Sequence, residues 1–261
     1  MMKNCPDCGA ANAQAARFCS QCGLKFPQDA AVPLQQTGQS ITDKLSAKMA
    51  AFVAQRSQAK ADILFVLDCT GSMQGEIDAI REAIVSVVEA IAQDGVQSRV
   101  GLIEFRDRFC GEDHRALING EVFTRQAQAF QAQIAQIQAG GGGDRPESSL
   151  DALLYATQQP FDPEAKKVIV LITDAPPHLP DRQVQTLDQV LQAFDHAGIH
   201  QFYPVIHTQE DASQVYLQLF QGRKGLAFEL GKGEDFRARA EHFKRTLMYL
   251  QRTISQATVG A

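Results

Sequence analysis

The apolar positions of this sequence follow two alternating patterns from residue 61 onward. Residues 63–67 and 168–172 are uninterrupted apolar runs, which are typical of strands buried on both faces of a parallel sheet. The stretches between such runs place apolar residues three and four positions apart, as residues 77–91 do, and this spacing indicates one face of a helix. The chain beyond residue 60 is therefore predicted to alternate strands with helices.

This alternation predicts an α/β fold. Strands are expected at residues 63–67, 100–105, 168–172, 199–206 and 225–230, with an antiparallel edge strand within 115–124. Helices are expected at residues 77–91, 125–138, 147–158, 182–197, 210–221 and 236–254. Strands and helices in this order form a Rossmann-like open sheet, mostly parallel with one antiparallel edge strand, with helices on both faces.

Polar residues gather where the predicted strands end, and in such sheets ligands bind beyond the carboxyl ends of the strands. Asp68-Cys-Thr70-Gly-Ser72 follows the first strand, and Asp174 follows the strand at 168–172. Asp68 and the hydroxyls two and four residues later can place three hard oxygens on one side of a turn. Such oxygens suit Mg²⁺. The sequence therefore predicts a divalent-cation site at this edge of the sheet.

The Asp68-x-Thr70-Gly-Ser72-Met turn after a buried strand, together with Asp174, resembles the metal-ion-dependent adhesion site (MIDAS) of von Willebrand factor type A (vWA) domains. The resemblance extends over about residues 61–256 in element order. The usual form in that family is D-x-S-x-S, so Thr70 replaces the first serine and keeps its hydroxyl. The resemblance implies that Asp68, Thr70 and Ser72 hold Mg²⁺, or Mn²⁺ or Ca²⁺, and that Asp174 acts through a coordinated water.

The loop between these two segments departs from the common pattern. Many vWA domains supply a threonine from this loop, whereas here it contains Gly-Gly-Asp144-Arg-Pro-Glu147. That stretch resembles the D-x-P-E loop of integrin β-type domains, in which the glutamate contributes to the same metal. Glu147 is therefore the expected loop ligand, with Asp144 second or serving an adjacent ion. A third carboxylate would raise the affinity for the metal and lower the electrophilicity felt by an incoming ligand.

Structural roles are the alternative for these residues. Asp68 and Ser72 could cap the helix that follows them, since Asp and Ser are common at that position. Asp144 and Glu147 could be an ordinary loop acid and an acid in the first turn of a helix. Asp174 at the end of a second buried strand favours the metal site over the helix cap.

Other reactive side chains near the strand ends are expected to have ordinary roles. Asp107, after the strand at 100–105, is predicted to be a solvated charge in a turn, with contact to the site through water as the alternative. His178 is predicted to be a loop histidine rather than a ligand. Cys69 and Cys110 are expected to be reduced thiols, because their separation in sequence gives no evidence of pairing.

Four cysteines near the N-terminus predict a second metal site. Cys5-Pro-Asp-Cys8 and Cys19-Ser-Gln-Cys22 are separated by ten residues, and each pair is followed by Gly. Two such turns can offer four thiolates to one tetrahedral Zn²⁺, which leaves no position for a catalytic water. The alternative, two disulfides, needs an oxidising compartment. Residues 3–26 resemble the short zinc ribbons found at the start of many bacterial multidomain proteins.

The predicted domains are a zinc ribbon at residues 1–26, a linker with an amphipathic helix at 27–60, and a vWA-like domain at 61–256. A helical apolar stripe supports the amphipathic helix, at Ile41, Leu45, Met49, Phe52 and Val53. The length of 261 residues and the 44% of hydrophobic residues suit one α/β domain with a small appendage. Residues 1–60 carry a net charge of +4 and residues 61–261 a net charge of −9.

The acidic main domain argues against nucleic-acid binding there, because phosphate contacts need clustered Lys and Arg. The basic N-terminal segment keeps nucleic-acid binding open as an alternative. The N-terminus lacks the apolar segment of a signal peptide, and the apolar runs are far shorter than the roughly 20 residues that span a bilayer. A cytoplasmic protein with no membrane partner is therefore expected.

The expected function is that of an adaptor rather than an enzyme, in which the bound Mg²⁺ accepts an Asp or Glu carboxylate of a partner protein. No P-loop and no G-x-S-x-G elbow is present. A phosphatase of the haloacid-dehalogenase type needs a second aspartate where Thr70 stands. A Mg²⁺-dependent hydrolase of phosphoesters, using metal-bound water, remains the enzymatic alternative.

Overall fold

The computed structural model describes residues 2–26, 45–46, 48, 50, 59–111, 115–116, 121–143, 145–231 and 236–259. The chain divides into two compact units, Met1–Met49 and Ala50–Ala261. The predicted linker and amphipathic helix at residues 27–60 fall almost entirely outside the described residues. No described helix is both long enough and apolar enough to cross a membrane.

The N-terminal unit is a small antiparallel hairpin held by cysteine-bearing turns. Strand β1 (Met2–Asn4) pairs with β2 (Ala11–Ala13) in antiparallel register. Among its described residues, the buried apolar cluster consists of Cys5, Cys19 and Phe26. So small an interior cannot supply the free energy of folding by itself, so this unit needs an additional source of stability.

The larger unit is built on a mixed, mostly parallel sheet. The parallel strands lie in the order β10-β8-β7-β3-β4, namely β10 (Phe228–Glu229), β8 (Gln201–Ile206), β7 (Lys166–Ile172), β3 (Lys60–Asp68) and β4 (Gln97–Phe105). Two short strands, β5 (Arg115–Ala116) and β6 (Phe123–Thr124), pair with β4 in antiparallel fashion, and β9 (Lys224–Gly225) pairs with β8. This confirms the predicted fold class, including its antiparallel edge.

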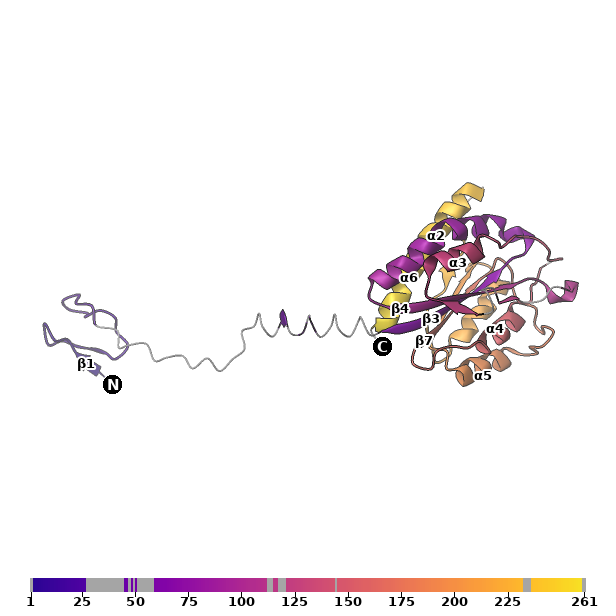
Figure 1. Ribbon diagram of the computed structural model, residues 1–261. Coiled ribbons are helices and arrows are strands. Elements are labelled where there is room, and N and C mark those ends of the chain that lie inside the picture. Colours follow the sequence, from indigo (N-terminus) through magenta and orange to yellow (C-terminus); the bar gives the residue numbers. More distant parts are fainter. Residues whose placement is uncertain are drawn as a thin grey trace. The chain divides into compact units, whose positions relative to one another are not determined.

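Helices cover both faces of this sheet (Figure 1). One face carries α2 (Gln74–Gln93), α3 (Ala127–Ile134) and α6 (Phe236–Val259), and the other carries α4 (Ser149–Thr157), α5 (Leu187–Ala197) and the 3₁₀ helix η3 (Asp211–Phe220). The side chains of β3 alternate between the two layers: Phe65 packs under α2 and α6, whereas Leu64 and Val66 face α4 and α5. Both faces are apolar, as predicted from the uninterrupted run.

The helix predicted at 210–221 is confirmed, and it is the 3₁₀ helix η3. Its fully buried residues are Ser213, Tyr216 and Leu219, which are spaced by three. A 3₁₀ helix has three residues per turn, so this spacing aligns all of them on one side, toward the sheet.

The strand predicted at 225–230 is interrupted in the structure. Gly225 pairs with Phe202 and Phe228 pairs with Val205, in one continuous register. The gap between β9 and β10 lies opposite Pro204, which has no backbone N–H to donate to the ladder. The proline therefore explains why one edge strand appears as two short pieces.

Two predicted helices begin later than expected. The helix predicted from residue 182 begins at Leu187, because Thr186 and Gln189 form a capping box that fixes its first turn. The helix predicted from Glu147 begins at Ser149. Glu147 therefore precedes the helix and is not an acid of its first turn.

Candidate functional site

The centre of the sheet brings the predicted site residues together. Strands β3 and β7 are neighbours, but the chain leaves them in opposite directions across the sheet, toward β4 and toward β8. The gap between such strands is the topological switch point, where open α/β sheets bind ligands. Asp68 ends β3, and Thr173 and Asp174 follow β7, so these residues lie at the same edge of the sheet.

Asp68 is completely buried and receives hydrogen bonds at both carboxylate oxygens. Its Oδ1 accepts from the backbone N–H of Thr70 (2.9 Å) and from Thr70 Oγ1 (2.7 Å), while its Oδ2 accepts from Thr173 Oγ1 (2.6 Å). Burial raises the pKa of Asp68 to about 6, and the neighbouring charge of Asp174 acts in the same direction. The hydrogen bonds to Asp68 therefore compensate the negative charge of its buried carboxylate only in part.

The hydroxyls of the turn face the same space. Thr70 Oγ1 and Ser72 Oγ lie 3.2 Å apart, so the two hydroxyls and the Asp68 carboxylate form one oxygen cluster. Ser72 belongs to the 3₁₀ helix η1 (Gly71–Met73), which leads into α2. Neither η1 nor α2 has a side-chain hydrogen bond at its N-cap. The structure therefore does not give these residues the role of helix caps.

The glycine loop packs directly on this turn. The backbone N–H of Gly140 donates to Cys69 O (3.0 Å), and the backbone N–H of Gly71 donates to Gly141 O (3.3 Å). Gly142 has a φ of +76°, and a Cβ there would lie 2.8 Å from Thr70 Cγ2 and 3.0 Å from Glu147 Oε1. Gly142 therefore permits the close approach that places the Glu147 carboxylate beside Thr70.

Glu147 is also fixed to the segment that follows β7. Its backbone N–H donates to Pro176 O (3.0 Å), and its carbonyl accepts from the backbone N–H of His178 (2.9 Å). The Glu147 residue is only 4% exposed. Thus the loop before α4, the turn after β3 and the segment after β7 meet at one place.

The structure separates the predicted ligands into groups. Asp68, Thr70, Ser72 and Glu147 lie together, and Asp174 is half-buried and close enough to raise the pKa of Asp68. Among the described residues, the carboxylate oxygens of Asp68, Glu147 and Asp174 do not all come within 4.8 Å of one another. The role of Asp174 through a coordinated water therefore stays a prediction. Asp144 lies outside the described residues.

Sequence reasoning missed two residues that shape the site. Thr173 donates a hydrogen bond directly to Asp68. The available signal in the sequence was its position next to Asp174 at a strand end. Arg106 donates from Nε to Gly140 O (2.8 Å) and from Nη2 to Gln138 O (2.8 Å), which anchors the glycine loop. A single arginine after a strand offers no distinctive pattern in the sequence.

The prediction that Asp107 is a solvated turn charge was wrong. Asp107 is 2% exposed. It accepts hydrogen bonds from the backbone N–H of Phe109 (2.8 Å) and from Cys110 Sγ (3.1 Å), and His178 Nε2 lies 3.3 Å from its Oδ1. The carboxylate stays buried because it organises the turn that carries Phe109.

The four N-terminal cysteines converge as the spacing predicts. Their sulfur atoms all lie within 4.8 Å of one another, with Cys5 Sγ 3.6 Å from Cys22 Sγ and Cys8 Sγ 3.5 Å from Cys19 Sγ. A tetrahedral zinc site with Zn–S bonds of 2.3 Å has sulfurs about 3.8 Å apart, so the donor set fits that ion. All four are free thiols rather than disulfides.

The two cysteine turns have the same backbone construction. Gly9 N–H donates to Cys5 O (2.9 Å), Gly23 N–H donates to Cys19 O (3.0 Å), and both glycines have a φ of +74°. The pKa of Cys19 is lowered to about 6 by the backbone N–H groups of Cys22 and Gln21. These donors favour the thiolate, which is the form that binds a metal.

A family comparison decides the identity of the larger unit. The model of the von Willebrand factor A domain matches residues 62–197, which include Asp68, the glycine loop and Asp174. The chain belongs to the von Willebrand factor A domain family. vWA domains commonly mediate protein–protein interaction and adhesion.

Two curated relatives share part of this vWA domain. The alpha-protein kinase vwkA of Dictyostelium discoideum is 30% identical over 129 residues, which are 49% of this chain and 20% of that protein. A putative ariadne-like RING finger protein R811 of Acanthamoeba polyphaga mimivirus is 26% identical over 125 residues, 47% of this chain and 12% of that protein. The chain therefore matches only a small part of each relative.

Solved structures share the fold. A von Willebrand factor type A protein from Catenulispora acidiphila superposes with a TM-score of 0.51 at 16% identity, covering 72% of this chain and 42% of that chain. The pilus adhesin SpaC from Lactobacillus rhamnosus GG, in an open conformation, superposes with a TM-score of 0.54 at 14% identity, covering 76% and 30%. At these identities the likeness concerns the fold alone.

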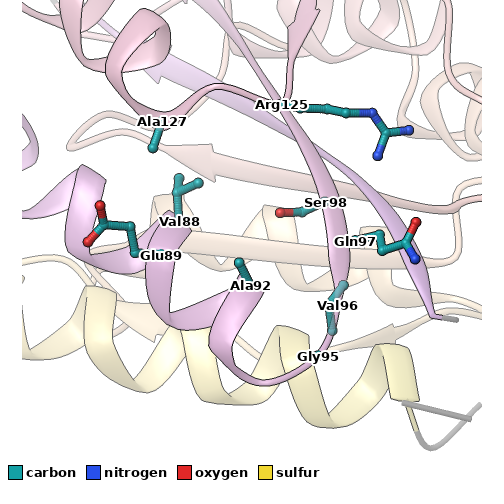
Figure 2. Close-up of a pocket in the computed structure, with 9 residues that line it drawn as sticks. All are labelled: Val88, Glu89, Ala92, Gly95, Val96, Gln97, Ser98, Arg125 and Ala127. Carbon is teal, nitrogen blue, oxygen red and sulfur yellow. The ribbon is translucent and has the colours of Figure 1, made fainter. Parts of the chain in front are cut away.

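One cavity of the vWA domain lies away from the candidate site. It measures about 420 Å³ and is lined by residues around the start of β4, at the amino end of that strand. Figure 2 shows the charged side chains of Glu89 and Arg125 at opposite sides of it. Small and apolar side chains such as Ala92 and Val96 form the wall between them. This cavity therefore lies at the opposite end of the strands from Asp68.

Proposed function

We propose that this chain is an adaptor whose vWA domain binds a partner protein through a divalent cation. The observation that carries the proposal is that the turn after β3, the segment after β7 and the loop before α4 meet at the oxygen cluster of Asp68, Thr70 and Ser72, with Glu147 beside Thr70. These residues offer hard oxygen donors, two of them carboxylates. Such donors suit Mg²⁺, with Mn²⁺ and Ca²⁺ as alternatives.

The residues of the cluster have distinct roles in this proposal. Asp68, Thr70, Ser72 and Glu147 would hold the ion directly, and Asp174 would act through a water. The raised pKa of Asp68 supports this assignment, because a cation would stabilise the buried charged form. The ion would supply a Lewis-acidic position for one further oxygen, which a partner's Asp or Glu carboxylate would fill.

Electrostatics explains why an ion is needed. Residues 61–261 carry a net charge of −9, which repels an acidic partner at long range. A divalent cation at the sheet edge reverses the local potential. The attraction would therefore be confined to the site, so that metal removal abolishes binding without changing the rest of the surface.

The N-terminal unit would bind structural Zn²⁺ through Cys5, Cys8, Cys19 and Cys22. Four sulfurs complete the tetrahedral coordination, so this ion would have no open position. Its role would be to fold the hairpin, whose apolar interior is very small. Four thiols organised for metal binding favour a reducing compartment, the cytoplasm.

In this proposal the chain is a binding module rather than an enzyme. The hydroxyls nearest Asp68 donate hydrogen bonds to that carboxylate, and among the described residues no histidine forms a hydrogen bond with them. Incubation of the Mg²⁺-loaded chain with a panel of phosphoesters tests this part. Steady turnover that Asp68→Ala abolishes would support the hydrolase alternative instead.

Affinity purification from cell lysate tests the adaptor role. The full chain is used with Mg²⁺, with EDTA followed by restored Zn²⁺, and as the Ser72→Ala variant, with Asp78→Ala as a control for a lost surface side chain. Proteins captured only with Mg²⁺, lost with Ser72→Ala and retained with Asp78→Ala are expected. The same proteins in every sample would contradict the metal bridge.

A further inference from the structure

Two large apolar side chains stand exposed beside the candidate metal site. Phe109 is 56% exposed and Leu179 is 47% exposed. Between them lies His178, whose ring centroid is 4.4 Å from that of Phe109. Phe109, His178 and Leu179 are called the apolar ledge below. Single exposed apolar residues are ordinary, whereas contiguous exposed apolar patches mark interaction surfaces.

The ledge is held in place by buried groups. Phe109 lies in the 3₁₀ helix η2 (Arg108–Cys110), whose N-cap Asp107 accepts a hydrogen bond from the Phe109 backbone N–H. The same carboxylate lies 3.3 Å from His178 Nε2. The backbone N–H of Arg108 donates to the buried Ser148 Oγ (3.0 Å). These contacts of buried groups therefore fix the backbone that carries the exposed Phe109 ring.

The ledge continues directly from the metal site. The His178 backbone N–H donates to the carbonyl of Glu147, the expected loop ligand. On the other side, a Cβ at Gly143 would lie 2.9 Å from Cys110 Sγ, while the adjacent Gly142 packs against Thr70. Two independent sets of contacts thus join the ledge to the residues around the ion position.

We infer that the partner's metal-binding carboxylate is accompanied by an aromatic or large aliphatic side chain that packs on the apolar ledge. This inference rests on the proposed function, because it requires a carboxylate at the ion. A partner anchored there must place its neighbouring atoms over the surface that surrounds the site. The Asp107 carboxylate beside the ledge is buried, so burial of apolar surface and not an ion pair with Asp107 would stabilise a partner there.

Two small carboxylates of nearly equal basicity test the inference. Acetate and 3-phenylpropanoate are titrated separately into the Mg²⁺-saturated full chain, and binding is followed by NMR. We expect 3-phenylpropanoate to bind about tenfold more tightly than acetate, because its ring buries apolar surface on the ledge. Phe109→Ala should reduce this preference to about twofold or less while the affinities for Mg²⁺ and acetate stay unchanged.

Tyr249→Ala is the matched control, since Tyr249 is a 61% exposed aromatic residue on α6. It should leave the preference intact. Equal binding of the two carboxylates to the wild-type chain would overturn the inference and leave the metal site standing. Failure of both to bind the Mg²⁺-loaded chain would overturn the proposed function itself. The wild-type chain could also self-associate while Phe109→Ala is monomeric. If Phe109→Ala then left the preference for 3-phenylpropanoate over acetate unchanged, the ledge would be a contact with a second copy, and the inference would be overturned.

Discussion

Asp68 concentrates the chemistry of the site in one residue. Its carboxylate is fully buried and is bonded by hydroxyl and amide donors, Thr70 and Thr173. Neutral donors compensate a buried negative charge only in part, and this is consistent with the pKa of about 6. The residue thus combines a rigid position with a charge that a divalent cation would stabilise.

Gly142→Ala should weaken metal binding without removing any ligand. The substitution places a Cβ 2.8 Å from Thr70 Cγ2 at a φ of +76°, so the loop must shift away from the turn. We expect a loss of about 2 kcal/mol in the free energy of unfolding and about a tenfold loss of Mg²⁺ affinity.

Gly140→Ala is the control in the same loop, because nothing lies within 4 Å of its Cβ position. Denaturant unfolding and calorimetric titration with Mg²⁺ measure both effects. Equal behaviour of the two variants would show that close packing of the glycine loop does not matter for the site.

Thr173→Val should expose the role of the hydroxyl that supports Asp68. Valine keeps the shape but leaves Asp68 Oδ2 without its 2.6 Å donor. We expect the metal-free chain to lose about 1–3 kcal/mol in the free energy of unfolding, and Mg²⁺ affinity to fall about tenfold or more.

Thr157→Val provides the comparison, since Thr157 Oγ1 donates to Leu154 O within α4, away from Asp68. Its effect on Mg²⁺ affinity should be negligible in the same calorimetric titration. Comparable losses of Mg²⁺ affinity in both variants would argue against a specific role for Thr173.

At the scale of elements, the sequence predicted what depends on the apolar pattern. The buried strands β3, β4 and β7 and the helices between them follow from runs and stripes that only a two-sided sheet can bury. The start of α5 was missed, although the capping signal at Thr186 and Gln189 was present in the sequence. The divided edge strand depends on Pro204 in a neighbouring strand, and pairing between distant segments cannot be deduced from either segment alone.

In the site, too, residues with a local signal in the sequence were predicted, and contacts between distant segments were not. The motif indicated Asp68, Thr70, Ser72 and Asp174, because their spacing after the strands is local information. The contribution of Thr173 and the burial of Asp107 depend on how separate loops pack. Apart from the position of Thr173 next to Asp174 at a strand end, such contacts carry no signature in a single sequence.

Arg99→Ala should separate stability of the sheet from function. Arg99 on β4 forms a bidentate pair with Asp62 on β3, which is 1% exposed, near the amino ends of the strands. Loss of the guanidinium leaves a buried carboxylate poorly paired, so we expect a cost of about 3 kcal/mol in the free energy of unfolding. Mg²⁺ affinity should not change, because the site lies at the other end of β3.

Lys244→Ala is the comparison for Arg99→Ala, because it removes a cation from a solvent-exposed pair with Glu82. Its cost should be below about 0.5 kcal/mol. Chemical denaturation measures both. An Arg99→Ala chain as stable as Lys244→Ala would show that the Asp62 pair contributes little.

At the scale of the whole molecule, the two units have separate interiors and separate candidate metals. The hairpin has a small apolar cluster and four convergent cysteine sulfurs, whereas the vWA domain has an extensive apolar core on both sides of its sheet. This difference in construction predicts different responses to chelation.

A zinc chelator that spares Mg²⁺ should unfold the N-terminal unit and leave the main unfolding transition in place. Cys19→Ser should have the same effect without chelator, because three sulfurs bind zinc less tightly than four. NMR spectra report the hairpin and calorimetry reports the vWA domain. A hairpin that keeps its dispersed signals after zinc removal would contradict metal-dependent folding.

The most direct measurement is the anomalous scattering of crystals of the full chain grown with Mn²⁺. We expect one strong peak bordered by the oxygens of Asp68, Ser72 and Glu147, with Asp174 joined to it through water and one position taken by a non-protein oxygen. Absence of a peak between these residues would contradict the proposed metal site. So would an ion whose every coordination position is filled by the chain itself, since no partner carboxylate could then bind it.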